Sequence, residues 1–270
     1  PLVCSQRCDR SVGDFECEPY SCILTISTTD GGSPPLTGRA YVTVKVLDEN
    51  NHAPMIAIRH FPDGSKDHSA ISENQNTPSI VALVTVTDAD QGTKISSLSI
   101  VSGNEKGHFK MVGTTDFQYS SISLISMPDR ERISVYNLTI VAVDSGIPPK
   151  SSTANLIVYV IDVNDHVPWF SKLDYRITLP ETLPIGSFIE SLTAHDEDSG
   201  QNAALTYSIL SGNTNGWFHL NDKTGLLTVG SRMHYNIAST VSMNISVHDG
   251  GPTPFYNFTS VTITILDEND

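Results

Sequence analysis

The chain is poor in basic residues and in long apolar runs, and both shortages narrow its function. It has 270 residues, with 16 Lys and Arg against 30 Asp and Glu, which gives a formal net charge of −14. So acidic a chain is a poor partner for nucleic-acid phosphates or for an anionic membrane surface. No apolar run approaches the roughly 18 residues that a membrane-spanning helix needs. The charge favours cations or basic partners, although solubility alone would also account for it.

A helical pattern and an N-terminal signal peptide are also missing. No stretch of helical length keeps an apolar period of 3.6 residues. The chain opens on Pro1-Leu2-Val3, without a charged and then apolar leader, and it stops inside a motif that occurs twice earlier. We therefore expect a piece of a longer protein, whose targeting and anchoring segments lie outside this sequence.

Cysteine is confined to one short stretch. The four cysteines are Cys4, Cys8, Cys17 and Cys22. Their spacings contain no C-x2-C pair, so disulfides are favoured over a zinc site, and three pairings stay open. Three Asn-x-Ser/Thr sequons begin at Asn137, Asn244 and Asn257. Together these features indicate an extracellular, oxidising compartment.

What the chain does contain is a repeat. The acidic run Asp162-Val163-Asn164-Asp165-His166 recurs in weaker form as Asp48–His52 and in cut-off form as Asp267–Asp270. Three other aspartates are each followed by glycine and proline, namely Asp30, Asp144 and Asp249. The runs and these turn aspartates are separated by the same 114 and then 105 residues. Independent markers that share one period of domain size indicate tandem domains.

Within each repeat, apolar residues alternate with polar ones. This holds for Ala40, Val42, Val44 and Val46, for Leu138, Ile140 and Ala142, and for Val261, Ile263 and Ile265. A period of two is typical of half-buried strands, and it places Asn137 and Asn244 on the solvent side. Short strands with Gly, Pro and Asn turns predict an all-β chain of tandem antiparallel, Ig-like β-sandwiches with Greek-key connections. We expect complete sandwiches over 53–166 and 167–270, and in 1–52 the last two strands of an earlier one with its linker.

These motifs together resemble the extracellular repeats of the cadherin superfamily, of the Fat, Dachsous and protocadherin kind, over nearly the whole chain. The resemblance implies sandwiches joined by linkers that bind Ca²⁺, in the extracellular part of a plasma-membrane protein. It implies cell–cell adhesion through other cadherin-type ectodomains, of the same or a different member, on a neighbouring cell. A non-adhesive spacer of a surface or matrix protein would share the calcium sites and lack only the recognition face.

At the junction centred on Asp162–His166, the resemblance implies three calcium ions. The matching residues are Glu73, Asp129, Glu131, Asp162, Asn164, Asp165, His166, Asp196, Asp198, Asn202 and Asp249. His166 stands where the family usually has Asn, at a position that resembles a backbone-carbonyl donor. Eight of these residues are carboxylates. Two like charges about 4 Å apart repel by about 1 kcal/mol even in water, so such a cluster favours hard cations with oxygen ligands.

The other two junctions depart from the pattern. The junction at Asp48 matches at Asp14, Glu16, Asp48, Asn50, Asp88, Asp90 and Asp144. There Asn51 replaces the central aspartate of the linker, and Lys94 stands where the next repeat has Asn202, so we expect weaker calcium binding. The last junction offers Glu181, Asp267, Asn269 and Asp270. Its D-x-E position reads His234-Tyr235-Asn236, so it is also poor in ligands.

Features that a catalytic site would need are missing. The nine histidines show no H-x-x-H or H-E-x-x-H spacing, and no nucleophile–base pair has a supporting context. Carboxylates at domain junctions, with the linker running through them, leave no open coordination position or pocket for a substrate. The sequence therefore predicts that the chain is not an enzyme.

Overall fold

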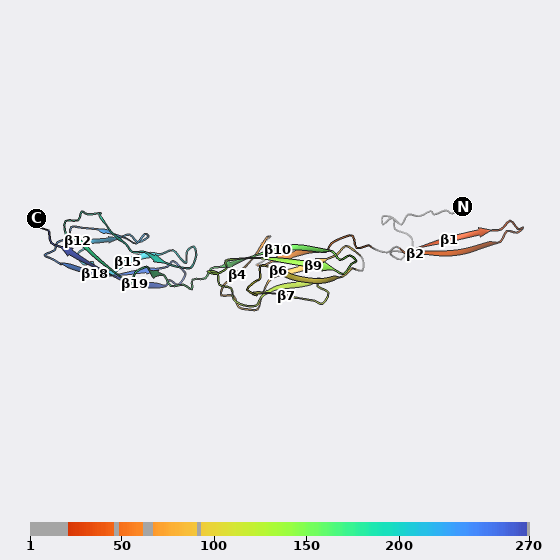
Figure 1. The fold of residues 1–270 in the computed structure, drawn as a ribbon, viewed down its shortest axis with the longest axis horizontal. Helices are drawn as coiled ribbons and strands as arrows, with labels where there is room; N and C mark the ends of the chain where they lie inside the picture. Colours follow the sequence, from red (N-terminus) through yellow and green to blue (C-terminus); the bar gives the residue numbers. More distant parts are fainter. Residues whose placement is uncertain (1–20, 46–48, 62–66, 91–92, 269–270) are drawn as a thin grey trace.

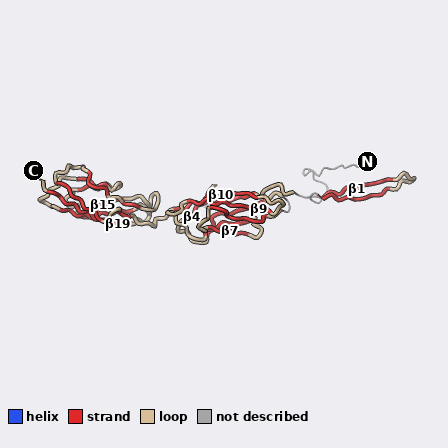
Figure 2. Tube along the Cα trace, in the orientation of Figure 1, coloured by secondary structure: helices blue, strands red, loops and turns tan. Residues whose placement is uncertain are grey.

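The structure is a computed structural model that describes residues 21–45, 49–61, 67–90 and 93–268. These residues form strands and connecting turns. No helix occurs among them, and hence none long and apolar enough to cross a membrane. Figures 1 and 2 show three β-structures in succession along the long axis: an N-terminal hairpin, a middle sandwich and a C-terminal sandwich.

The hairpin consists of β1 (Ser21–Thr29) and β2 (Thr37–Lys45), which pair antiparallel over their whole length. Asp30 holds its turn, because its Oδ1 accepts hydrogen bonds from the backbone N–H of Gly32 at 3.0 Å and of Leu36 at 2.9 Å. Val42 and Val44 are 42% and 44% exposed, although the alternation predicts one buried face. The pattern does produce strands, but burial needs a second sheet, and none covers these valines among the described residues.

The middle sandwich has two four-stranded sheets, in the orders β4-β10-β9-β6 and β3-β5-β8-β7. Its strands are β3 (Met55–His60), β4 (His68–Ser72), β5 (Ser79–Thr87), β6 (Ile95–Ser102), β7 (Phe109–Gly113), β8 (Tyr119–Leu124), β9 (Val135–Asp144) and β10 (Ser151–Ile161). The alternating residues Leu138, Ile140 and Leu156 lie between the sheets with no exposed surface. They pack with buried residues from β4 to β10 in one core.

The C-terminal sandwich repeats this plan with its own core. It has a four-stranded sheet β12-β19-β18-β15, a three-stranded sheet β13-β17-β16 and the pair β11-β14. Its strands are β11 (Trp169–Phe170), β12 (Asp174–Pro180), β13 (Phe188–Ser191), β14 (Ala194–His195), β15 (Thr206–Ser211), β16 (Phe218–Leu220), β17 (Leu226–Val229), β18 (Thr240–His248) and β19 (Tyr256–Leu266). Trp217 and Phe218 belong to this core and are 4% and 3% exposed. Trp169 packs on the ring of His195 with centroids 4.7 Å apart and stays 48% exposed.

The all-β prediction is confirmed, with one pair in each sandwich running differently. β4 pairs with β10, and β12 pairs with β19, in parallel rather than antiparallel orientation. In the middle sandwich, β3 and β4 come from one continuous stretch but pair in different sheets. This stretch therefore covers an edge of both sheets, and it meets β10 running in the same direction. Local alternation carries no information about that crossover.

The strand ends bring the acidic residues to one place. Glu73 follows β4, Asp162 follows β10, and Glu131 lies in the loop between β8 and β9. From the next sandwich, Asp196 follows β14 and Asp249 follows β18. Two sandwiches therefore present acidic turns to the same linker.

Candidate metal centre

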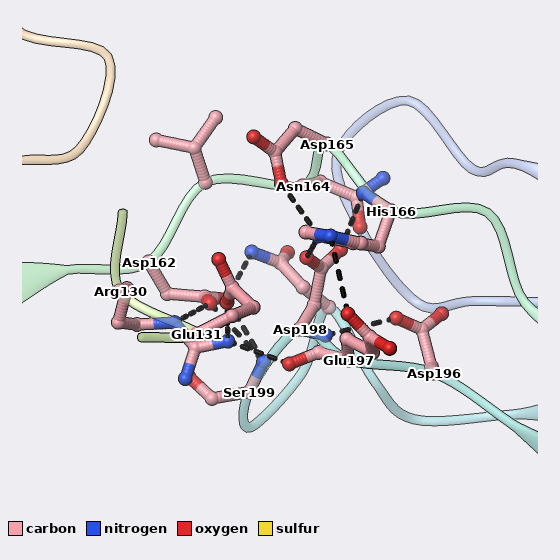
Figure 3. Close-up of polar contacts among 12 residues, drawn as sticks. Arg130, Glu131, Asp162, Asn164, Asp165, His166, Asp196, Glu197, Asp198 and Ser199 are labelled. Carbon is pink, nitrogen blue, oxygen red and sulfur yellow. Dashed lines mark hydrogen bonds and ion pairs between the residues drawn. The ribbon is translucent and has the colours of Figure 1, made fainter. Parts of the chain in front are cut away.

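Acidic side chains of both sandwiches meet at the linker around Asp162–His166 (Figure 3). One ligand atom each of Glu131, His166 and Asp198 lie within 4.8 Å of one another. A second group of the same kind consists of Glu73, Glu131 and Asp165. Glu131 belongs to both groups, so it joins them into one acidic cluster between the sandwiches.

Arg130 enters this cluster from the loop between β8 and β9. Its guanidinium forms ion pairs with Glu131 and with Asp162, and all three side chains are 14% exposed. Its Nη2 also donates to the backbone carbonyl of Glu197, in the next sandwich, at 2.7 Å. No role was predicted for Arg130 from the sequence, where the available signal is a basic residue between two acids. It binds the loop, the linker and the next sandwich together.

Asp162 ties the start of the linker to the C-terminal sandwich. Its oxygens lie 3.2 and 3.1 Å from the backbone N–H of Ser199, and its Oδ2 accepts from Nδ2 of Asn202 at 2.8 Å. Asn202, one of the predicted calcium ligands, thus holds the linker aspartate with its side-chain amide.

Asp249 anchors the middle of the linker from a fully buried position. It accepts hydrogen bonds from the backbone N–H of Gly251 at 2.9 Å and of Phe255 at 2.8 Å. Nδ2 of Asn164 lies 3.4 Å from both of its oxygens and donates to the carbonyl of Thr253 at 3.1 Å. A Cβ on Gly251 would come within 2.4 Å of the Asn164 side chain. Glycine is therefore needed for the linker to approach this turn.

His166 holds the end of the linker with its side chain as well as its backbone. Its Nδ1 lies 3.0 Å from Asp198 and 2.8 Å from Asp165, and its backbone N–H donates to Asp198 at 3.4 Å. Asp198 in turn donates its backbone N–H to Asp196 at 3.0 Å. His166 thus supplies a second positive charge to the cluster when it is protonated.

The charge crowding shifts the acid–base properties of the cluster. Burial raises the pKa of Asp196, Asp198 and Glu131 above their usual values, and the neighbouring carboxylates add to the rise. Burial by itself lowers the pKa of His166, but the hydrogen bond to Asp198 and the nearby acids outweigh it and raise that pKa overall. Both effects mean that the cluster favours additional positive charge.

We expect the C-terminal sandwich to lose stability as pH rises from about 4 to 8 in buffer free of divalent cations. When the pKa of a carboxyl group is raised by folding, the folded state still holds a proton at a pH where the unfolded state has lost it. The free energy of unfolding therefore falls as pH rises above the usual aspartate pKa of 3.8. The contribution of His166 is complete below its usual value of 6.5 and is lost as pH rises through its raised folded pKa. The carboxyl groups and His166 therefore both lower the free energy of unfolding as pH rises.

Tryptophan fluorescence measures this loss selectively, because the chain has two tryptophans and both lie in this sandwich. Urea titrations across the pH range give the free energy of unfolding. His166→Asn should flatten the curve above pH 6.5, the usual value for histidine. A free energy of unfolding that rises steadily from pH 5 to 8 would contradict the raised pKa values.

The junction at Asp48 has the same linker contacts within its described residues. Residues 1–20 and 46–48 lie outside the described ranges, so Asp14, Glu16 and Asp48 stay predictions. In the described part, Nδ2 of Asn50 donates to Asp144 at 3.3 Å and to the Pro148 carbonyl at 2.7 Å. Nδ1 of His52 lies 2.7 Å from Asp90. These are the contacts of Asn164 with Asp249 and of His166 with Asp198, made again one repeat earlier.

The remaining predicted residues are less involved. Asp129 pairs with Arg132 at 3.0 Å, with 48% of its side chain exposed. Glu181 accepts hydrogen bonds from the backbone N–H of Tyr235 at 2.8 Å and of Glu268 at 3.4 Å, which lowers its pKa. Asn269, Asp270, Cys4, Cys8 and Cys17 lie outside the described residues, so their ligand and disulfide assignments stay predictions.

A further observation tests whether these residues suit a cation. Five buried side-chain oxygens of predicted ligand residues accept no hydrogen bond: Asn50 Oδ1, Asp88 Oδ2, Asp144 Oδ2, Asn164 Oδ1 and Asp196 Oδ2. A buried polar group without a partner costs about 1–3 kcal/mol. Carboxylate and amide oxygens are the ligands that calcium takes, in sets of six to eight. The donor set at both linkers therefore fits calcium.

Known proteins share the repeats of this chain. The family model described as "Cadherin domain" matches residues 67–161 and 175–266. The chain is 42% identical over 269 residues to human Protocadherin Fat 4, covering 95% of this chain and 5% of that protein. It is 30% identical over 260 residues to Protein dachsous of Drosophila melanogaster, covering 95% of this chain and 7% of that protein. The chain is thus a small part of the length of these relatives.

Solved structures agree with the fold. The structure described as the protocadherin gammaB7 EC3-6 cis-dimer superposes with a TM-score of 0.78 at 28% identity, over 93% of this chain and 59% of that chain. Mouse cadherin-23 EC22-24 superposes with a TM-score of 0.74 at 25% identity, over 92% of this chain and 75% of that chain.

Proposed function

Because the chain belongs to the cadherin family, we propose that it forms part of an extracellular adhesion rod whose repeat junctions bind calcium. Its relatives are adhesion proteins and not enzymes. The acidic cluster is therefore a joint between repeats rather than a hydrolytic site. The repeats proposed here are 53–166 and 167–270, with 1–52 contributing to a preceding one.

The unpaired buried oxygens at the two linkers carry this proposal. At the joint around Asp162–His166, the residues that would hold calcium are Glu73, Asp129, Glu131, Asp162, Asn164, Asp165, His166, Asp196, Asp198, Asn202 and Asp249. When bound, calcium supplies the positive charge that the clustered carboxylates lack. The chain itself orients the linker, through the contacts of Asp249 with Asn164 and of Asp198 with His166.

The joint around Asn50, Asn51 and His52 would bind calcium more weakly. Asn51 brings no charge to the linker, and fewer ligand charges lower calcium affinity. The contacts of Asn50 and His52 nevertheless keep the linker on the middle sandwich. This joint is therefore proposed as the more flexible of the two.

The partners proposed for the rod are other cadherin-type ectodomains. Every relative compared above is a cadherin-type protein, and the gammaB7 structure is described as a cis-dimer. The location that suits this role is the outside of the plasma membrane, with the anchor elsewhere in the protein. A rod of fixed bend would present the same surfaces to a neighbouring ectodomain each time.

Calcium titration of the whole chain, with small-angle scattering, tests the proposal. We expect calcium to bind and to reduce the range of conformations that the chain adopts in solution. A chelator should reverse both effects. Asp198→Asn should weaken calcium binding at least about tenfold, because it removes one ligand charge at a buried position. The matched control is Asp174→Asn, whose carboxylate pairs with Arg176 away from the joint. The proposal would be overturned if the scattering curves were the same with and without calcium and the calorimetric titration showed no heat of binding.

A further inference from the structure

The three sequons differ in how the fold uses their asparagines. Asn137 lies on β9 and Asn244 on β18, each a central strand of its four-stranded sheet. Both asparagines are exposed, while their neighbours Leu138 and Ile245 are fully buried. Within the described chain, neither side chain makes a hydrogen bond. A large substituent on either amide would therefore point to solvent and displace nothing.

Asn257 is used differently, although its sequon is equally intact. Its Nδ2 donates to the carbonyl of Pro168 at 2.8 Å, and its Oδ1 accepts from the backbone N–H of Phe258 at 2.7 Å. Thr259, the hydroxyl residue of the same sequon, is 5% exposed and donates to the carbonyls of Lys172 and Leu173. This asparagine fixes the end of the linker to β19, so a sugar on its nitrogen would crowd the linker.

A hollow adjoins Asn137. It has a volume of about 230 Å³, and its lining includes Gly103, Lys106, Ile133 and Tyr136 as well as Asn137. Gly103 has a φ of +82°, and a Cβ there would lie 2.0 Å from the Asn137 carbonyl oxygen. Only glycine therefore allows the backbone at residue 103 to lie this close to the Asn137 carbonyl. Pockets for drug-sized ligands measure about 300–1,000 Å³, so this smaller hollow suits one sugar ring.

We propose that Asn137 and Asn244 carry N-linked glycans, that Asn257 carries none, and that the first sugar on Asn137 sits in this hollow. In the transfer, Nδ2 of asparagine bonds to the anomeric carbon of N-acetylglucosamine on a lipid diphosphate donor. The bond from that carbon to the diphosphate oxygen breaks, the nitrogen loses one proton, and the lipid diphosphate leaves. The assignment rests on the extracellular placement in the proposed function.

The apolar and charged lining explains why a sugar would stay in the hollow. Ile133 and the 44% exposed Val135 offer apolar surface to one face of the ring, while Lys106 offers N–H donors and Glu105 offers acceptors to its hydroxyl groups. The strand itself positions the sugar, because Asn137 pairs with Ile157 in the antiparallel β9–β10 register. The glycan would then shield the outer face of the sheet β4-β10-β9-β6.

Secretion of the whole chain from animal cells, behind a secretion leader, tests the assignment. Peptide mass spectrometry after enzymatic release in ¹⁸O-water marks each occupied asparagine. We expect Asn137 and Asn244 to be marked and Asn257 to be unmarked. Asn137→Gln and Asn244→Gln should each remove the mass of one glycan, whereas Asn257→Gln should remove none. A glycan on Asn257 of the folded protein, or none on Asn137, would overturn the proposal.

A positive control separates this proposal from the calcium proposal. Ile185→Asn completes a new sequon with Gly186 and Ser187, in a turn where Ile185 is 66% exposed. This variant should gain one glycan. A gain there with none on Asn137 refutes the glycan assignment and leaves the calcium joint untouched, since scattering with and without calcium decides that separately.

Enzymatic shortening of the glycan tests whether its first sugar occupies the hollow beside Asn137. In the Asn244→Gln variant, which keeps only the glycan on Asn137, an endoglycosidase that leaves one N-acetylglucosamine should leave the melting temperature unchanged, and complete removal should lower it. An equal melting temperature after both treatments would show that the hollow holds no sugar.

Discussion

Asp249→Ala is expected to lower the free energy of unfolding of the C-terminal sandwich by about 3 kcal/mol, with or without calcium. Asp249 has no exposed surface and accepts backbone hydrogen bonds from Gly251 and Phe255. Truncation leaves the buried donor of Gly251 and the partly buried donor of Phe255 without this partner, and a buried group of this kind costs about 1–3 kcal/mol. It also removes the Asp249 contact of Asn164, which leaves the linker asparagine only its hydrogen bond to the Thr253 carbonyl.

Urea titration followed by tryptophan fluorescence measures the effect on this sandwich alone. The matched control is Asp174→Ala, an aspartate of the same sandwich whose partner Arg176 is exposed. Surface changes of that kind usually stay within about 0.5 kcal/mol. An Asp249→Ala loss seen only in calcium would mean that the residue acts as a ligand without a structural role. No loss in either condition would refute the buried-anchor account.

Arg130→Gln is expected to destabilise the chain by about 2 kcal/mol in chelator and by much less in calcium. Arg130 pairs with Glu131 and Asp162 at low exposure. Removing one partner of a buried ion pair costs about 3–5 kcal/mol, and partial exposure reduces this by screening. Calcium would neutralise the same acids, so the variant should bind it more tightly than the unchanged chain does.

Calorimetric unfolding with and without calcium measures both parts of this prediction. Scattering in chelator should also show a wider range of shapes, because Arg130 links the middle sandwich to the Glu197 carbonyl of the next one. Arg176→Gln, which breaks an exposed pair with Asp174, serves as control. Equal losses in calcium and chelator would show that Arg130 supports the fold and does not stand in for a cation.

The two linkers are built alike where both are described. In each, an asparagine binds a buried aspartate after the second-last strand, and a histidine binds the second aspartate of a D-x-D motif. A glycine packs against the linker asparagine in both, Gly146 against Asn50 and Gly251 against Asn164. These contacts would hold the linker in place before calcium arrives, so that binding orders fewer groups.

Strand positions, core residues and the places of the acids all follow from the amino-acid sequence. Alternation is a local property, so it correctly places Leu138 and Ile140 in the core of the middle sandwich and Asn137 outside. The repeated turn aspartate is a buried carboxylate in each sandwich, Asp144 in one and Asp249 in the other, because both repeats have the same fold. The family and the all-β class follow from the same motifs.

Which side chains meet depends on the three-dimensional fold. The role of Arg130 depends on contacts with Asp162 and Glu197, which are 32 and 67 residues away along the chain. Three identical sequon patterns become different once Asn257 meets Pro168 across 89 residues. The hairpin valines alternate as core strands do, yet burial requires a second sheet that the described residues do not supply. A one-dimensional pattern records which face a residue occupies, whereas its partner across the fold is set by the path of the chain.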